Sequence, residues 1–280
     1  GRTCRTARLC TGDHDPRYST AMRFLRKRVL AGEVLAGTFC NLGSPITTEI
    51  AGRAGFDWLL LDLEHGSGDQ SELMHQLQAA GAADTPALVR IAWNEPWRFK
   101  RVLDAGAAGV MVPWVSTPEE AQAAAEAMRY FPDGVRGAAT LIRANGFSRR
   151  RDEYLEAAND NLLTVVQIET RQAVDNAAAI AAVEGVDVLF VGPFDLSIGL
   201  GIRGQFDHPR LTAALETVVA GARAAGKAAG ILLQRTDQVA ATVKRGFTFV
   251  AIGSDAGLVA NGMAELADAF TPYRMRLEEE

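Results

Sequence analysis

The stretch AGFDWLLLDLEHG, residues 54–66, contains the unit from which the fold of the whole chain is predicted. A glycine, typical of the C-terminal end of a helix, is followed by a continuous apolar run and then by polar and charged residues. Continuous apolar runs of this length are typical of parallel strands that are buried on both faces. We therefore interpret residues 54–66 as a helix end, a buried strand and a polar strand end.

The same unit recurs along the chain. From about Val34 onward, short branched apolar runs alternate with Ala-rich stretches of helical period, a pattern that indicates successive βα units. Eight strands are predicted, at residues 34–40, 58–63, 87–91, 109–113, 163–168, 187–192, 228–233 and 247–253. Eight units in 280 residues favour an α/β fold closed as a (β/α)8 TIM barrel, which typically takes ~250 residues, over an open doubly wound sheet.

Two segments depart from this regular pattern. Residues 1–17 are polar, basic and without periodicity, so we interpret them as a leader and assign residues 18–280 to one barrel domain. Residues 132–161 form a long excursion before the fifth strand. Long excursions in compact domains are often functional, so this segment is expected to cover the site or to contact a neighbouring subunit, with a solvated connector as the alternative.

Composition narrows the classes of function. The chain is 48% hydrophobic and 22% charged with a net charge of −5, which gives no footprint for nucleic acid or an anionic membrane. No apolar run approaches the ~20 residues of a membrane span. The three cysteines form no CxxC pair, which favours a reducing cytoplasm. A small-molecule substrate is therefore the favoured partner.

Polar side chains collect at the predicted C-terminal ends of four strands, and in a barrel these ends face the active-site mouth. They are Asp62, Glu64 and His65 on the second strand, Arg90 on the third, Gln167 and Glu169 on the fifth, and Asp195 after the sixth. The four lysines, Lys27, Lys100, Lys227 and Lys244, all fall elsewhere. A Schiff-base mechanism needs an amine in the mouth, so that mechanism is not expected.

Glu169 and Asp195 are the predicted metal ligands. They lie one βα unit apart, so adjacent strand ends bring both carboxylates into one mouth. Two carboxylates without a Cys or His cluster suit a hard, oxygen-preferring cation such as Mg²⁺ or Mn²⁺. The alternative is that each acid caps the helix that follows it.

His65, Asp62 and Arg90 are the predicted catalytic groups. An imidazole exchanges a proton near neutral pH, and a carboxylate such as Asp62 would orient it as a general base; a purely structural histidine is the alternative. Arg90 stands in an apolar strand and needs an anion, which a substrate carboxylate or enolate oxygen would supply. The alternative for Arg90 is a buried ion pair with Asp62 or Glu64.

The motifs DLEHG (62–66), VR (89–90), VQIET (166–170) and GPFDLS (192–197), in this order and spacing, resemble those of the HpcH/HpaI hydroxyketoacid aldolases, which are class II pyruvate aldolases. The resemblance covers roughly residues 31–269. It implies reversible cleavage of 4-hydroxy-2-oxo acids to pyruvate, or hydroxypyruvate, and an aldehyde. It also implies a divalent cofactor, Mg²⁺, Mn²⁺ or Co²⁺, and a homohexamer whose dimers exchange the eighth helix, here about residues 254–269.

The resemblance also implies roles for individual residues. Glu169 and Asp195 ligate the metal with Gln167 beside it, Arg90 steadies the enolate oxygen, and His65 relays protons with Asp62. The remaining predicted site residues are Asp104 and Glu64 in support, backbone donors around Phe194 for the pyruvate carboxylate, and Leu232 as an apolar wall. An acyl-CoA lyase of the citramalyl or malyl type and a non-catalytic barrel that binds 2-oxo acids stay open as alternatives.

Overall fold

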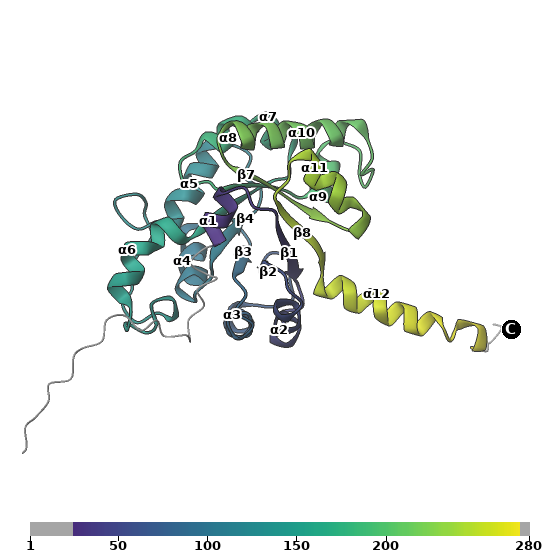
Figure 1. Cartoon of the computed structure of the whole chain (residues 1–280), viewed down its shortest axis with the longest axis horizontal. Helices are drawn as coiled ribbons and strands as arrows, with labels where there is room; N and C mark the ends of the chain where they lie inside the picture. The colour runs from purple at the N-terminus through teal and green to yellow at the C-terminus, as the bar shows by residue number, and fades with distance from the viewer. Residues whose placement is uncertain (1–24, 275–280) are drawn as a thin grey trace, which may run out of the picture.

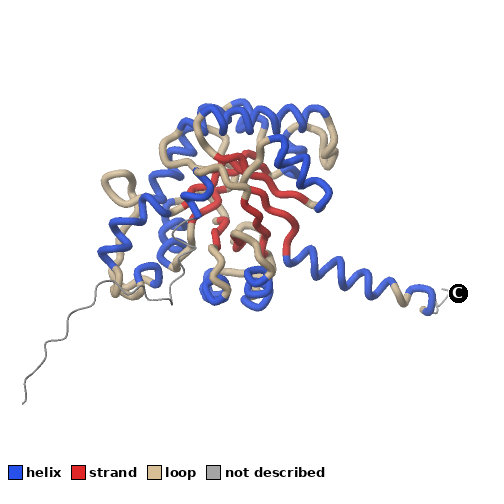
Figure 2. Tube along the Cα trace, in the orientation of Figure 1, coloured by secondary structure: helices blue, strands red, loops and turns tan. Residues whose placement is uncertain are grey.

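The computed structural model describes residues 25–274, so the predicted leader lies outside the described part of the chain. Eight parallel strands close into a barrel in sequence order (Figures 1 and 2), which confirms the predicted (β/α)8 fold. Every strand lies within two residues of its predicted bounds. The strands are β1 (Leu35–Cys40), β2 (Trp58–Asp62), β3 (Ala87–Arg90), β4 (Gly109–Val112), β5 (Leu163–Ile168), β6 (Val188–Val191), β7 (Ala228–Leu233) and β8 (Phe249–Ser254).

Helices surround the barrel, and local sequence sets where several of them begin. Asp69 and Thr117 form capping boxes with Glu72 and Glu120, which satisfy backbone N–H groups at two helix starts. The helices are α1 (Leu25–Leu30), α2 (Pro45–Arg53), α3 (Gln70–Ala82), α4 (Pro96–Asp104), α5 (Pro118–Met128), α6 (Arg151–Asn161), α7 (Arg171–Asp175), α8 (Ala177–Ala182), α9 (Pro193–Gly199), α10 (Pro209–Ala224), α11 (Val239–Arg245) and α12 (Asp255–Asp268). None in the described range is long and apolar enough to cross a membrane.

Large side chains fill the barrel interior. The rings of Trp58 and Phe249 stack with centroids 4.0 Å apart, and Phe190 meets both edge-on. Gly37 makes this packing possible, because a Cβ there would lie 2.2 Å from the Trp58 ring. Helix α1 packs buried Leu25 onto the same cluster. The interior is therefore solid, and chemistry is confined to the rim where the strands end.

The 132–161 excursion does not cover this rim. It joins α5 to β5 and contains a 3₁₀ turn at Arg143–Asn145 followed by α6. Connections from a helix to the next strand return to the end of the barrel where strands begin. Arg143 anchors the excursion there by donating from Nη1 to the Ala105 carbonyl, just beyond the end of α4. The expectation that this segment covers its own chain's site is therefore wrong, and contact with a neighbouring subunit stays a prediction.

Helix α12 leaves the barrel instead of packing on it (Figure 1). Its apolar side chains are exposed, among them Leu258 (74%), Met263 (65%) and Leu266 (67%). The helix lies within the predicted range of the eighth helix. A short helix gains most of its stability from packing, so this apolar surface calls for a partner.

Candidate active site

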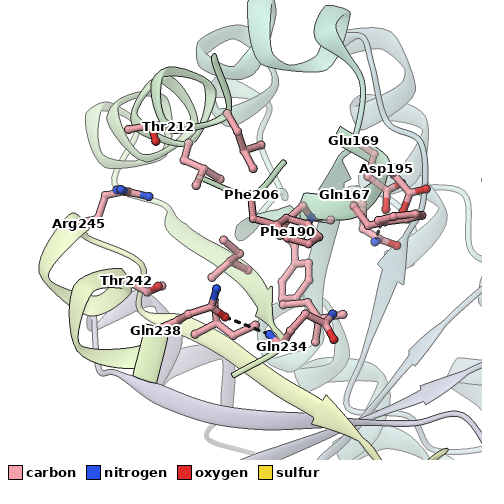
Figure 3. Close-up of a pocket in the computed structure, with 18 of the residues that line it drawn as sticks. Gln167, Glu169, Phe190, Asp195, Phe206, Thr212, Gln234, Gln238, Thr242 and Arg245 are labelled. Carbon is pink, nitrogen blue, oxygen red and sulfur yellow. Dashed lines mark hydrogen bonds between the residues drawn. The ribbon is translucent and has the colours of Figure 1, made fainter. Parts of the chain in front are cut away.

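The polar residues predicted at the strand ends converge on one rim of the barrel. A cavity of about 300 Å³ opens there (Figure 3). Its lining includes six of the predicted site residues, which are Arg90, Gln167, Glu169, Phe194, Asp195 and Leu232. Asp62 and Glu64 do not line the cavity themselves but form ion pairs with Arg90, which does. The closed sheet thus brings together groups that are far apart in the sequence.

Strands β2 and β3 supply an ion-paired half of the site. Asp62 and Arg90 are partners in the sheet register, so their side chains emerge next to each other. Arg90 donates from Nε and Nη2 to the two Asp62 oxygens at 2.8 and 2.7 Å, and its Nη1 lies 3.0 Å from Glu64 Oε2. Burial by itself raises the pKa of Asp62, but the hydrogen bonds and charge of Arg90, together with backbone hydrogen bonds from Glu64 and His65, outweigh burial and hold that pKa below its usual value. Burial also raises the pKa of Glu64, against the opposing charge of Arg90.

The buried ion pair that was the alternative interpretation of Arg90 is therefore present. It does not use all the N–H donors of the guanidinium, so some stay available to a substrate. A guanidinium has five N–H donors, of which these three contacts engage at most three. Arg90 also lines the cavity. Its remaining N–H groups can donate to an oxygen in the mouth while the two carboxylates fix the plane of the guanidinium.

His65 differs from the sequence-based expectation. Asp62 accepts from the backbone N–H of His65 at 3.3 Å, whereas the imidazole Nε2 lies 3.8 Å from Glu64 Oε2. Arg90 occupies both Asp62 oxygens, because the two residues are in register on adjacent strands. The carboxylate beside the ring is thus Glu64. The imidazole is 68% exposed, so it is open to substrate and solvent.

Sequence reasoning missed Asn41, which follows β1. Its side chain donates to Asp62 Oδ2 at 2.5 Å, and its backbone N–H donates to Asp255 Oδ1 at 2.7 Å. Asp255 is the first residue of α12, so Asn41 links the Asp62–Arg90 pair to the base of that helix. An isolated polar residue after a strand gave no motif by which to find it.

Strands β5 and β6 supply a half of the site that carries uncompensated negative charge. Glu169 is 3% exposed, and burial raises its pKa to about 7. The Trp114 backbone N–H, which donates to Glu169 at 3.2 Å, and the charge of Arg90 oppose this rise, whereas Asp195 and Glu64 add to it. A Cβ on Gly192 would lie 2.7 Å from Glu169 Oε1, so a side chain at this position would displace the carboxylate.

Trp114 also went unpredicted, although its backbone conformation marks the site. Its φ of 56° is in the left-handed region, which is uncommon for a bulky residue. That conformation accompanies the hydrogen bond from its N–H to Glu169. Backbone strain of this kind collects at functional sites, and no sequence pattern reveals it.

Neither predicted metal ligand acts as a helix cap. Thr170 is the capping residue of α7 and accepts from the Ala173 N–H at 3.0 Å. Gly192 stands at the cap position of α9, and Asp195 lies in the first turn without capping it. Among the described residues, the Asp195 carboxylate has no recorded hydrogen-bond or ion-pair partner. The capping alternative is therefore wrong for both acids.

This half of the site fits a hard divalent cation. Gln167 donates from Nε2 to Glu169 Oε1 at 2.6 Å, while its own Oε1 is buried without a hydrogen-bond partner. Buried oxygen atoms without donors are costly, and a cation that prefers oxygen satisfies them. Within the described residues no group of three or more His, Cys, Asp or Glu side chains is placed to hold a metal. A ligand set of two carboxylates would leave coordination positions for substrate and water.

The remaining predicted residues are divided between the rim and the far end of the barrel. Phe194 is 47% exposed at the rim, and Leu232 is partly buried at the cavity wall. Asp104 lies at the C-terminal end of α4, away from this chain's own mouth, and pairs with buried Arg136 at 2.8 Å. All four lysines lie in the described range, and none is at the C-terminal end of a strand.

Comparison with known proteins decides the family. The model of the HpcH/HpaI aldolase/citrate lyase family matches residues 35–262. The chain belongs to the HpcH/HpaI aldolase/citrate lyase family. It is 43% identical over 240 residues to 5-keto-4-deoxy-D-glucarate aldolase of Klebsiella pneumoniae subsp. pneumoniae, an alignment that covers 86% of this chain and 93% of the relative.

Solved structures of HpcH/HpaI proteins agree. A family member from Burkholderia cenocepacia is 37% identical with a TM-score of 0.83, covering 88% of this chain and 98% of its own. An HpcH/HpaI aldolase from Desulfitobacterium hafniense is 30% identical with a TM-score of 0.83, covering 92% and 100%. The predicted resemblance is confirmed, and with it the class of enzyme, a carbon–carbon lyase of the aldolase type that acts on hydroxy-keto acids. The family is divalent-metal dependent.

Proposed function

We propose that this HpcH/HpaI aldolase reversibly cleaves 4-hydroxy-2-oxo acids to pyruvate, or hydroxypyruvate, and an aldehyde, using Mg²⁺, Mn²⁺ or Co²⁺ held by Glu169 and Asp195. The observation that carries the proposal is the contrast within one cavity between these two uncompensated carboxylates and the fixed guanidinium of Arg90. A 2-oxo acid fits between them, because its neighbouring oxygens bind a hard cation and its developing negative charge needs a donor. The 43% identity to 5-keto-4-deoxy-D-glucarate aldolase supports a sugar-acid substrate.

The residues of the chain divide the work of cleavage. The bound cation supplies Lewis acidity at the keto oxygen of the 2-oxo acid. His65, whose imidazole is exposed and lies beside Glu64, takes the proton of the 4-hydroxyl group as the bond between carbons 3 and 4 breaks. Arg90 donates to the oxygen that becomes negative in the enolate. His65 then returns this proton to carbon 3 of the enolate, which completes pyruvate and restores the neutral imidazole, and the condensation is the reverse.

The other predicted residues have supporting roles in the same proposal. Gln167 holds the Glu169 carboxylate through its Nε2. Backbone donors around Phe194 bind the pyruvate carboxylate at the rim, and Leu232 gives the substrate an apolar wall. Glu64 and Asp62 fix Arg90. Asp104 lies far from this chain's mouth, so any role it has at a site is in a neighbouring subunit.

We also propose that the protein forms a homohexamer, built as a trimer of dimers, and that the two subunits of each dimer exchange α12. The support is the apolar surface of α12, whose exposed side chains pack on nothing among residues 25–274 beyond the base of the helix, together with exposed Ile46 (71%) and Ile50 (63%) on α2, a helix that α12 contacts. Leu266→Glu is expected to shift the molar mass measured by light scattering from hexamer to smaller species, whereas Glu265→Gln on the same helix leaves it unchanged. A hexamer that tolerates Leu266→Glu contradicts the exchange. The cysteine usage supports a cytoplasmic location.

The decisive experiment is pyruvate release from 4-hydroxy-2-oxo acids. Protein stripped with EDTA is assayed alone and after addition of Mg²⁺, Mn²⁺ or Co²⁺, and borohydride is added in a parallel sample during turnover. We expect activity only with metal and no trapped adduct. Activity that is indifferent to EDTA, or a borohydride-trapped lysine adduct, contradicts the proposed metal site.

A further inference from the structure

Asp255, the first residue of α12, is a buried acid that the function proposed above does not use. It is 8% exposed, and its carboxylate forms no ion pair within residues 25–274. A buried charge without a counter-charge needs several hydrogen-bond donors. Strands β1 and β8 pair in parallel up to Phe39 and Ser254, so Asp255 emerges beside the loop that follows β1.

Most of the donors to Asp255 come from that loop and the helix after it. Its Oδ1 accepts from the backbone N–H groups of Asn41 and Leu42 at 2.7 and 3.3 Å, and from that of Ala256 at 2.8 Å. Its Oδ2 accepts from the Thr47 hydroxyl at 2.6 Å. An acid in the first turn of a helix usually serves the N–H groups of its own helix. Here three of the four donors belong to the chain after β1, so the carboxylate ties that chain to the base of α12.

Asn41 passes this constraint to the Asp62–Arg90 pair. Its backbone N–H is held by Asp255, and its backbone carbonyl accepts from the Ser67 N–H at 2.7 Å. With both backbone groups fixed, the side-chain amide donates to Asp62 Oδ2 at 2.5 Å. Arg90 Nη2 donates to the same oxygen at 2.7 Å. The orientation of the Asp62 carboxylate, and with it the plane of the guanidinium, therefore depends on where Asn41 lies.

We propose that Asp255 is a positioning residue for Arg90 and acts on it through Asn41. This inference rests on the aldolase function proposed above, in which Arg90 donates to the enolate oxygen. A donor that stabilises a developing charge has to be fixed before the reaction, and a misplacement of about 1 Å can cost roughly a hundredfold in rate. The machinery of the site thus extends from the strand ends to the first residue of α12.

Substitution of Asp255 tests this role through kcat. Asp255→Ala removes the acceptor that holds Asn41, so it should lower kcat roughly tenfold, the lower range for a hydrogen bond to a charged group. KM should change little, because the donor from Arg90 acts mainly in the transition state. Asp255→Asn keeps an oxygen at the position of Oδ1, and its amide can donate to the Thr47 hydroxyl, so it should recover most of the activity.

A matched control comes from the same pair of strands. The Thr38 hydroxyl joins β1 to β8 by donating to the Ile252 carbonyl at 2.9 Å, and it has no recorded hydrogen bond to Asn41. Thr38→Val should therefore lower the thermal unfolding temperature and leave kcat unchanged. A Thr38→Val variant that loses as much kcat as Asp255→Ala would make the effect of Asp255 a general one and overturn the proposal.

A double-mutant cycle shows whether Asp255 acts through Arg90. In protein that already carries Arg90→Ala, Asp255→Ala should have little further effect on kcat, because the group that it positions is gone. The same fold-loss in both backgrounds overturns the proposal, as does full activity of Asp255→Ala. Asp255→Glu keeps the charge but displaces the carboxylate by one methylene, so it takes the place of Asp255→Ala in the cycle if the alanine variant does not fold.

Oxalate binding reports on Arg90 without turnover. Oxalate resembles the planar enolate of pyruvate and is titrated calorimetrically into the metal-loaded full-length protein. Asp255→Ala should weaken oxalate binding roughly tenfold and leave the affinity for Mg²⁺ or Mn²⁺ unchanged. Unchanged oxalate affinity, or an equal loss of metal affinity, overturns the proposal. If no 4-hydroxy-2-oxo acid is cleaved, the aldolase function fails, and the oxalate titration still decides whether Asp255 positions Arg90.

Discussion

The two halves of the site solve the same problem of buried charge in opposite ways. At the ends of β2 and β3, Asp62 and Glu64 both pair with Arg90 of the same chain, and Asn41 adds a further donor to Asp62. At the ends of β5 and β6, buried Glu169 accepts from the Trp114 backbone and the Gln167 amide but forms no ion pair among the described residues, and burial raises its pKa to about 7. The first half thus contains a cationic side chain that pairs with its carboxylates, whereas no cationic side chain of residues 25–274 forms an ion pair with Glu169 or Asp195.

This difference indicates a division of labour. A guanidinium held by two carboxylates is fixed before substrate arrives, as stabilisation of a developing negative charge requires. Carboxylates without a protein cation bind one from solution and leave some of its coordination positions to the substrate. Substitutions that remove a charge or a hydrogen-bond donor from one half at a time therefore test the mechanism.

The largest effect is expected from neutralising the uncompensated half. Glu169→Gln should weaken Mg²⁺ or Mn²⁺ binding by more than about a hundredfold, since even residues that only support metal ligands cost about 10–100-fold. Pyruvate release should disappear. Glu64→Gln is the matched control in the paired half and should leave metal affinity nearly unchanged. Calorimetric titration measures both variants, and equal losses would remove the distinction between the halves.

Arg90→Ala should lower kcat by roughly 10²–10³, the cost of losing one donor to a developing oxyanion, with metal still bound. Arg90→Lys restores the charge without the planar fork, so it should recover only part of the activity. Thermal unfolding of each variant checks that the barrel is intact, because Arg90→Ala leaves Asp62 buried and unpaired. Activity near that of the unmodified protein in Arg90→Ala contradicts its role at the enolate.

Stability in metal-free protein should change in opposite directions in the two halves. The folded-state pKa of Glu169 is raised to about 7, so its burial begins to penalise the fold as the pH rises past the unfolded-state pKa of about 4.3, and the penalty is complete above about 7. Glu169→Gln should therefore stabilise alkaline protein by at most about 3 kcal/mol. The pKa of Asp62 is lowered, so it stabilises the fold above its unfolded-state pKa of about 3.9, and this stability is lost as the pH falls through the lower folded-state value. Asp62→Asn should therefore destabilise neutral protein. Denaturant unfolding at several pH values measures both changes, and shifts of the same sign contradict this account.

The smallest effect is expected at Asn41, which supports the paired half from outside. Asn41→Ala removes a donor to Asp62 and should lower kcat/KM by roughly tenfold, the lower range for a hydrogen bond to a charged group. Asn41→Asp keeps the size of the side chain but places a like charge against Asp62, so it should cost more. Metal affinity should stay constant in both. An Asn41→Asp variant with full activity removes Asn41 from the site.

Much of this protein could be predicted from its sequence. The eight strands follow from continuous apolar runs, because a strand covered on both faces needs apolar side chains at every position. The positions of Arg90, Glu169 and Asp195 at the mouth follow from their places at strand ends, because parallel strands in a closed barrel end at the same rim. Both signals are local, and each is contained in a few consecutive residues.

Contacts across the barrel were decided only by the tertiary structure. The sequence placed Asp62 beside His65, but the register of β2 and β3 gives its carboxylate to Arg90. The hydrogen bond from Asn41 to Asp62 joins residues 21 positions apart, and the one from Trp114 to Glu169 joins residues 55 positions apart. The apolar pattern and the strand order in the sequence determine the barrel and the positions of residues at its rim. The pairing of side chains depends on the distances between segments that are far apart in the sequence, and only the folded structure sets those distances.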